Sequence, residues 1–153
     1  METGRLLACV DGSRASMEAA RVAIDLAKRW NSVLRALYVV ETNERDSEID
    51  GTPDAGLTAR LHDSGRAILA HVAEMGAAAG VAVVQGLLEG VPFDAIIDDA
   101  RAWKADLIIM GRTGRTGPGR ALLGSEAERV LEFTDRPVLI VPTLQAQTSG
   151  SRR

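Results

Sequence analysis

Two kinds of hydrophobic pattern alternate along the chain. Short apolar runs bounded by turn residues predict buried β-strands, and longer stretches with an apolar residue every three to four positions predict amphipathic helices. Strands are predicted at residues 5–10, 33–40, 81–88, 106–110 and 137–141. Helices are predicted between them, from Ser13 to Trp30, from Leu57 to Gly80, from Pro92 to Trp103, and over 125–133. Strand and helix therefore alternate strictly.

Several residues predict where the helices begin and end. Ser13 follows a turn and is a good N-cap, because its hydroxyl oxygen can accept from a free N–H of the first helical turn. Gly80 stands just past the last periodic residues, where a left-handed C-cap is common. Pro92 suits the first position of a helix. Residues 41–54 are acidic, contain Gly and Pro and show no period, so they predict a loop.

The strict alternation predicts an α/β fold: one Rossmann-like domain with a five-stranded parallel sheet and helices on both faces. A chain of 153 residues is the usual size of a single domain. We expect this domain to occupy residues 1–142 and a polar, disordered tail to occupy 143–153. Ligands of such folds bind beyond the carboxyl ends of the strands, where the winding direction reverses. The functional site is therefore expected after the first and fourth strands.

Composition and charge exclude several classes of function. The net charge of −3 gives no basic footprint, so no nucleic-acid partner is expected. Cys9 is the only cysteine, which excludes an intramolecular disulfide and a cysteine-based zinc site. The first residues lack the basic and apolar segments of a signal peptide, and no apolar run approaches the ~18 residues that span a bilayer. We expect a cytoplasmic protein without membrane contact.

A glycine-rich segment follows the fourth predicted strand. Residues 111–124 hold five glycines, which let the backbone approach a ligand and turn successive N–H groups toward an anion. The N-terminus of the helix that begins at Ser125 favours negative charge, and Arg112, Arg115 and Arg120 can neutralise phosphate. A plain surface loop with solvated arginines is the alternative, and the position beside the expected switch point favours the anion site.

Two common nucleotide motifs do not fit this segment. Gly119-x4-Gly124 has P-loop spacing, but Ser125-Glu126 replaces the Lys-Ser/Thr pair that contacts phosphate and metal. The dinucleotide pattern Gly-x-Gly-x-x-Gly fails at Leu122 and follows the wrong strand. A P-loop NTPase and a Rossmann dehydrogenase are therefore disfavoured.

The spacing Gly111-x2-Gly114-x9-Gly124-Ser125 resembles the ATP-binding motif of the universal stress protein family. It stands between the fourth strand and the fourth helix, where that family carries it. The resemblance extends over almost the whole chain, through the ends of the first, second and last strands at residues 8–13, 37–40 and 136–142.

This resemblance implies a set of ATP-binding residues. Val10 and Asp11 are placed near the ribose and adenine, and Val39 is placed against the base. Gly111, Gly114, Gly124 and Ser125 are expected to hold the phosphates, with Mg²⁺ or Mn²⁺ bridging them. Arg112 joins the expected ATP-binding residues because its charge can neutralise phosphate. Val10 and Val39 equally suit simple sheet core. Asp11 is either a helix N-cap or an acceptor for a ribose hydroxyl.

The resemblance implies a nucleotide-dependent regulatory protein. Nothing near the glycine segment resembles an activated nucleophile beside a base, so a fast enzyme is not expected, and slow ATP hydrolysis stays an alternative. A protein of this fold that acts only through contacts with an unknown protein partner is another. The family also forms dimers through its last strand. Because the apolar strand 137–141 is unprotected by charges, we expect a homodimer through it.

The remaining chemically notable residues are expected to be structural. His62 and His71 lack partners at metal-ligand spacing. Cys9 is expected to be buried and unreactive. Trp30 and Trp103 are expected to pack in the core or at an interface.

Overall fold

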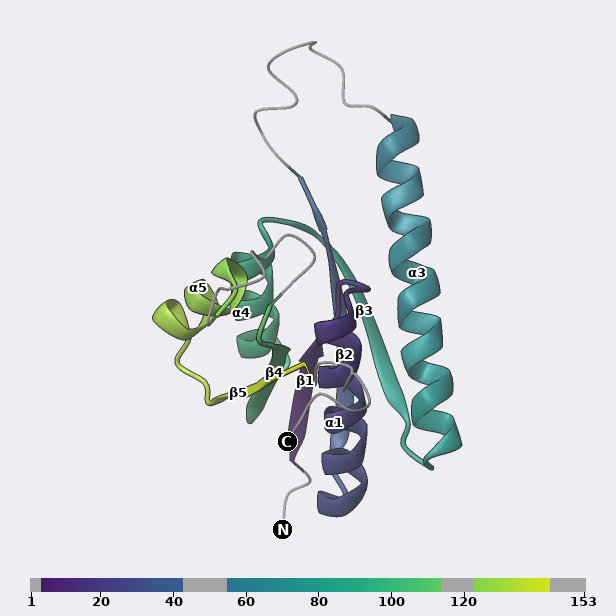
Figure 1. Ribbon diagram of the computed structural model, residues 1–153, viewed down its shortest axis with the longest axis vertical. Helices are drawn as coiled ribbons and strands as arrows, with labels where there is room; N and C mark the ends of the chain where they lie inside the picture. Colours follow the sequence, from purple (N-terminus) through teal and green to yellow (C-terminus); the bar gives the residue numbers. More distant parts are fainter. Residues whose placement is uncertain (1–3, 43–54, 114–122, 144–153) are drawn as a thin grey trace, which may run out of the picture.

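The structure is a computed structural model that describes residues 4–42, 55–113 and 123–143. Over these residues strands and helices alternate as the sequence pattern predicts (Figure 1). The elements are β1 (Arg5–Cys9), α1 (Arg14–Trp30), β2 (Val33–Glu41), α3 (Ala55–Ala78), β3 (Val83–Gly90), α4 (Pro92–Ala102), β4 (Leu107–Gly111), α5 (Ser125–Phe133) and β5 (Val138–Val141). The expected loop over 41–54 and the expected tail fall almost entirely outside the described residues.

The strands form one parallel sheet in the order β3-β2-β1-β4-β5. The chain runs outward from the central strand β1 through β2 to β3, and then crosses back to β4 and β5. The winding direction therefore reverses between β1 and β4, whose residues pair from Leu6↔Leu107 to Ala8↔Ile109. This reversal places the carboxyl ends of β1 and β4 side by side, where ligands of this fold class bind.

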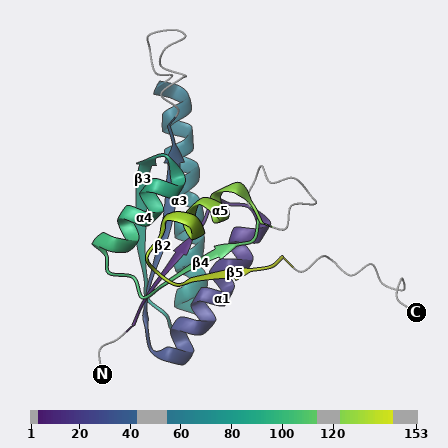
Figure 2. The ribbon, with the colours of Figure 1, turned by 90° about the vertical axis from the view of Figure 1, so that its left-hand side faces the viewer.

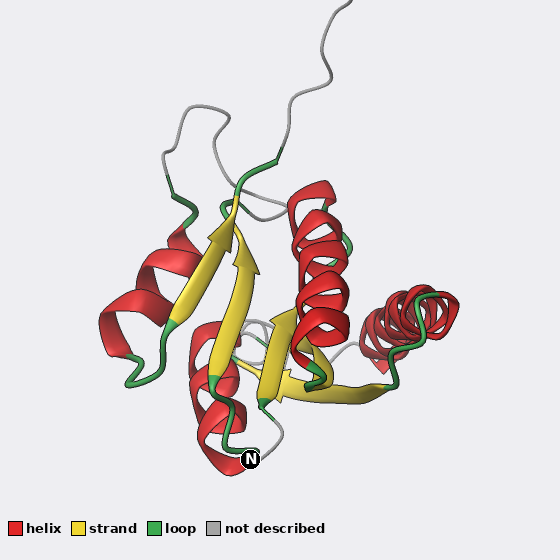
Figure 3. Cartoon of the chain, turned by 90° about the horizontal axis from the view of Figure 1, so that it is seen from below, coloured by secondary structure: helices red, strands yellow, loops and turns green. Residues whose placement is uncertain are grey.

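Two helical layers cover the sheet. Helices α1 and α3 pack on one face, and α4 and α5 pack on the other, in front of the sheet in Figure 2. Figure 3 shows the strands between the two layers. Each layer closes its own apolar cluster, one around Leu34, Tyr38 and Leu69, the other around Leu7, Ile108 and Val130. The predicted fold class, a five-stranded parallel α/β sheet with helices on both faces, is therefore confirmed.

The predicted helix ends are confirmed where the local chemistry is distinctive. The Ser16 N–H donates to Ser13 Oγ at 3.1 Å, which makes Ser13 the N-cap of α1. Pro92 is the first residue of α4, and α5 spans the residues expected for it. No helix of the described segments is long and apolar enough to span a bilayer.

The third strand begins two residues later than expected. The apolar residue Val81 reads as strand in the sequence, but its N–H donates to the Gly76 carbonyl at 2.8 Å and closes the end of α3. Gly80 adopts a φ of 78°, the left-handed conformation that lets the chain make this turn. β3 therefore covers Val83–Gly90 and not 81–88.

Two apolar residues assigned to buried helix faces are exposed. Trp30 is 56% exposed at the last position of α1, so its expected core packing is wrong, and an interface role stays a prediction. Leu57 is 50% exposed near the start of α3, whose first turns extend beyond the sheet (Figure 1). Trp103, by contrast, is half-buried against the apolar cluster beneath α4 and α5.

A partly buried ion pair joins the sheet to α4. Arg35 of β2 donates from Nε to Asp99 Oδ2 at 2.8 Å and from Nη2 to Asp99 Oδ1 at 2.9 Å. The guanidinium group lies over Gly86 of β3, where an added Cβ would approach Arg35 Nη2 to 2.6 Å. The absence of a side chain at Gly86 therefore leaves room for the Arg35 guanidinium group and its two hydrogen bonds to Asp99.

Candidate functional site

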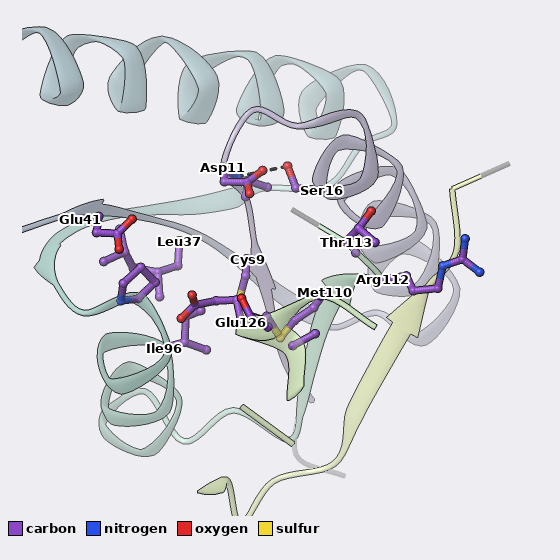
Figure 4. A pocket seen from close by; sticks show the side chains of 17 residues that line it. Cys9, Asp11, Ser16, Leu37, Glu41, Ile96, Met110, Arg112, Thr113 and Glu126 are labelled. Atoms are coloured by element: carbon purple, nitrogen blue, oxygen red, sulfur yellow. Dashed lines mark hydrogen bonds between the residues drawn. The ribbon is translucent and has the colours of Figure 1, made fainter. Parts of the chain in front are cut away.

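A pocket opens at the carboxyl ends of β1, β2 and β4, between the start of α1 and the starts of α4 and α5. Its inner wall is apolar and its mouth is polar (Figure 4). The wall consists of Cys9, Val10, Leu37, Val39, Pro92, Ile96, Met110 and Ala127. The mouth consists of Asp11, Ser16, Glu41, Gly111, Arg112, Thr113, Gly124 and Ser125, and the Glu126 side chain lies among the residues of the wall. The lining of the pocket therefore suits a ligand with an apolar part and a polar part.

Seven of the eight expected site residues line this pocket. They come from three separate segments, the end of β1, the end of β2 and the two sides of the glycine segment: Val10, Asp11, Val39, Gly111, Arg112, Gly124 and Ser125. The eighth, Gly114, lies outside the described residues, as do Arg115 and Arg120.

The turn after β1 holds Asp11 in a fixed orientation. The Asp11 N–H donates to Ser16 Oγ at 3.1 Å, and Asp11 Oδ1 accepts from the Ser13 N–H at 2.8 Å. Gly12 has a φ of 83°, which only glycine adopts without strain. The helix-cap alternative for Asp11 is wrong, because Ser13 caps α1. The Asp11 carboxylate orders the turn and lies at the mouth of the pocket.

The backbone of β2 presents a donor and an acceptor to the pocket. The Val10 N–H donates to the Leu37 carbonyl at 2.9 Å, so the backbone groups of Leu37 point toward β1. In a parallel strand those of Val39, two residues on, point the same way. The pairing of β1 with β2 ends at Cys9↔Leu37. No described strand therefore reaches the Val39 N–H and C=O on that side, and both face the pocket that Val39 lines.

Hydrogen bonds of Arg112 bring the two ends of the glycine segment together. The Arg112 N–H donates to the Val141 carbonyl at 3.0 Å, and the Gly124 N–H donates to the Arg112 carbonyl at 2.7 Å. The Arg112 side chain points away from the apolar wall in Figure 4, and its Nε is buried without a partner among the described residues. The backbone of Arg112, more than its charge, shapes this part of the pocket.

The structure places different constraints on the two described glycines of the motif, Gly111 and Gly124. Gly111 ends β4 against the first turn of α1, where an added Cβ would lie 2.7 Å from the backbone C and O atoms of Ala15. Gly124 is the buried N-cap of α5, with φ −68° and ψ 154°. Because any residue can adopt that conformation, only lack of space can require glycine at position 124.

The universal stress protein family model matches residues 2–142. The chain belongs to this family. Universal stress protein MJ0531 of Methanocaldococcus jannaschii is 42% identical over 135 residues, which cover 86% of this chain and 77% of the relative. The family resemblance carried by the glycine motif is therefore confirmed.

Solved structures show the same fold. Universal stress protein UspA from Lactobacillus plantarum matches with a TM-score of 0.79 at 23% identity, over 92% of this chain and 99% of that chain. A universal stress protein in complex with cAMP matches with a TM-score of 0.68 at 26% identity, over 94% of this chain and 100% of that chain. An adenine nucleotide is thus a ligand of a similar member of the family.

Two acidic residues in the pocket of this universal stress protein were missed from the sequence. Glu41 ends β2, and Glu126 lies in the first turn of α5, directly after the motif serine. Burial raises the pKa of the Glu126 carboxyl group, and the charges of Glu41 and Asp11 raise it further. A hydrogen bond from the Phe93 N–H and the charge of Arg129 oppose that rise. The sequence did offer one signal for Glu126, which is an acidic residue directly after Ser125 of the predicted phosphate site.

The expectation that Cys9 and His62 have only structural roles can be compared with their surroundings in the structure. Cys9 is buried as expected, and burial raises the pKa of its thiol, which disfavours the reactive thiolate. His62, which was expected to lack a special role, pairs through Nε2 with Glu89 Oε1 and so ties α3 to β3. The described residues contain no group of three or more His, Cys, Asp or Glu side chains arranged to hold a metal ion.

Proposed function

We propose that this universal stress protein binds ATP in the pocket at the carboxyl ends of β1, β2 and β4, and that nucleotide binding regulates its contacts with a protein partner in the cytoplasm. The observation that carries the proposal is the convergence of three distant segments, each expected to contact nucleotide, on one pocket. The cAMP complex of a similar protein supports an adenine nucleotide as the ligand class.

The apolar wall and the exposed backbone of Val39 suit the base. Adenine carries a ring nitrogen acceptor beside an amino donor on its Watson–Crick edge, by which proteins commonly recognise a base. These groups complement an N–H donor and a C=O acceptor on one residue. Val10 and Val39 supply apolar contact in this proposal, and Asp11 Oδ1 or Oδ2 accepts from a ribose hydroxyl.

The start of α5 suits the phosphates. Gly124 and Ser125 lie at the N-terminus of this helix, where free N–H groups and the helix dipole favour an anion. Gly111, Arg112 and Gly114 complete the proposed phosphate site from the other side of the segment. Since the described residues offer no metal-binding group of their own, we propose that the phosphate oxygens chiefly hold the accompanying Mg²⁺ or Mn²⁺.

Calorimetric titration with MgATP tests the proposal. Binding is expected, and ATP at about 100 times its Kd is expected to raise the free energy of unfolding by ~2.7 kcal/mol, which shifts the melting temperature of a domain of this size by roughly 5–10 °C. Gly124→Val is expected to abolish the heat of binding, because its side chain would occupy the buried space at the start of α5.

Gly119→Ala is the matched control, because Gly119 lies outside the motif. Absence of binding in the unaltered protein would refute the nucleotide proposal and leave a module that acts through protein contacts alone. Equal loss in both variants, with folding intact, would show that the motif positions have no special role. Analysis of ATP incubated with the protein for released phosphate separates slow hydrolysis from simple binding.

We also propose that the protein forms a homodimer through β5. This strand lies at one edge of the sheet, with β4 as its neighbour. The Ile108 N–H donates to the Pro137 carbonyl and the Arg112 N–H to the Val141 carbonyl, so odd-numbered residues of β5 face β4. The backbone groups of Val138 and Ile140 therefore face outward, free to pair with a second copy.

Light scattering is expected to give twice the chain mass of 16.3 kDa. Ile140→Pro removes an outward N–H without removing a bond to β4, and is expected to shift the equilibrium toward the monomer. Leu139 and Ile140 each pack against one of the two apolar clusters, so a thermal melt verifies that the variant is folded. A concentration-independent mass of one chain for the unaltered protein would refute the dimer.

A further inference from the structure

Glu126 is the acidic residue nearest to the proposed phosphate site in the sequence, one residue after Ser125. Its side chain does not extend outward from α5. It lies in the pocket beside Cys9, Met110 and Ile96 (Figure 4). A carboxyl group therefore shares an apolar pocket with the ligand expected there.

The carboxyl group is only partly satisfied by the protein. The Phe93 N–H, in the first turn of α4, lowers the pKa of this carboxyl group. The N-cap of that helix, Val91, supplies no side-chain hydrogen bond of its own. Glu126 Oε1 is buried and has no hydrogen-bond partner among the described residues. An ionised carboxylate with one unpaired, buried oxygen is costly, so this environment favours the protonated form.

The charges that face Glu126 are mostly negative. Asp11 follows β1, Glu41 ends β2, and both raise the pKa of the Glu126 carboxyl group, after the larger effect of burial. Arg129, on α5 itself, lowers it, but its guanidinium group also lies over the Phe93 ring, 5.2 Å from the ring centroid.

Among the described residues that line the pocket, Arg112 is the one cation. Arg112 lines the pocket from the end of β4, with its side chain directed away from the wall. The α4 residues of the wall, Pro92 and Ile96, do not ionise, and the Cys9 thiol of β1 stays neutral because burial raises its pKa. Of the charged side chains that act on the Glu126 carboxyl group, Asp11 and Glu41 raise its pKa and Arg129 lowers it.

We propose that the Glu126 carboxyl group makes the affinity of this pocket for phosphate-bearing ligands depend on pH, with tight binding only when the group is protonated. The inference rests on the proposed nucleotide site. An anion bound at the N-terminus of α5 lies close to the half-buried Glu126 side chain, and like charges at short distance repel. Ligand binding therefore takes up a proton at Glu126, and a rise in pH opposes binding.

Calorimetric titration with cAMP across about pH 5–9 tests this inference. cAMP is the suitable probe, because its phosphodiester carries one charge that does not titrate near neutral pH. The Kd of the unaltered protein is expected to be constant on the acid side and then to rise by up to about tenfold per pH unit, the limit for one linked proton. Glu126→Gln keeps the shape and the acceptor for the Phe93 N–H but cannot ionise, so its Kd is expected to stay flat.

Glu41→Gln is the matched control. It removes one of the charges that raise the pKa of Glu126, so the Kd is expected to begin its rise at a lower pH, with the rise itself retained. Thermal melts at each pH verify that all three proteins are folded. Binding with the same pH profile in the unaltered protein and in Glu126→Gln would overturn the inference and leave the nucleotide site intact. Absence of cAMP and ATP binding at every pH in both would remove the nucleotide site and this inference with it.

Discussion

Asp99→Ala is expected to lower the free energy of unfolding by about 3 kcal/mol, the lower end of the cost of removing one partner of a buried ion pair, because this pair is partly buried. The side chains of Arg35 and Asp99 are only 17% and 10% exposed, and two hydrogen bonds join them. Without the carboxylate, the Arg35 guanidinium group stays enclosed between α4 and Gly86 with its charge uncompensated. Denaturant unfolding monitored by circular dichroism measures the change.

Asp25→Ala is the matched control, since it removes a carboxylate from the exposed pair of Arg29 and Asp25, whose side chains are 71% and 59% exposed. An exposed pair of this kind contributes about 0–1 kcal/mol. The predicted contrast is therefore a large loss at Asp99 beside a small one at Asp25. Equal small losses would contradict the structural role given to the partly buried pair.

The order and class of the elements followed from the sequence because each signal is local. Pro92 fixes a helix start through its own φ, and the Ser13 hydroxyl caps the helix that follows it. The start of β3 was predicted wrongly at Val81, because an apolar residue after a helix suits both the closing turn and the next strand. Only the hydrogen bond of Val81 to Gly76 distinguishes the two. The core packing predicted for Trp30 was wrong because the periodicity of a helix does not show where the sheet beneath it ends.

The pocket was predictable only where residues belong to a spaced motif or close a strand. Gly124 and Ser125 were identified in this way, and so was Asp11. Glu126 was not, because inclusion in a pocket depends on which way a side chain turns and on what packs around it. Glu41 was not, because the sequence pattern assigned it to the loop, and only the structure shows that it ends β2. The Arg35–Asp99 pair was missed for a similar reason, since its partners lie 64 residues apart in the sequence. Such contacts leave no local pattern in a single sequence.

The first glycine of the motif illustrates a further limit of motif-based inference. The sequence assigns Gly111 to phosphate contact, yet the structure gives it a second constraint. Its Cα faces the first turn of α1, and an added Cβ would lie 2.7 Å from the backbone C and O atoms of Ala15 and 2.9 Å from the Ala15 Cβ. Backbone atoms of a helix cannot turn aside as a flexible side chain does, so α1 or β4 would have to shift.

Gly111→Ala is therefore expected to destabilise the protein in the absence of any nucleotide, by about 1–3 kcal/mol, as is typical when an atom is forced into a packed interior. Ala15→Gly in the same chain removes only the contact at 2.9 Å, so it is expected to restore little of the lost stability. Denaturant unfolding without ligand measures both variants. Unchanged stability of Gly111→Ala, together with weaker ATP binding, would show that contact with phosphate, and not packing against α1, is what requires glycine at this position.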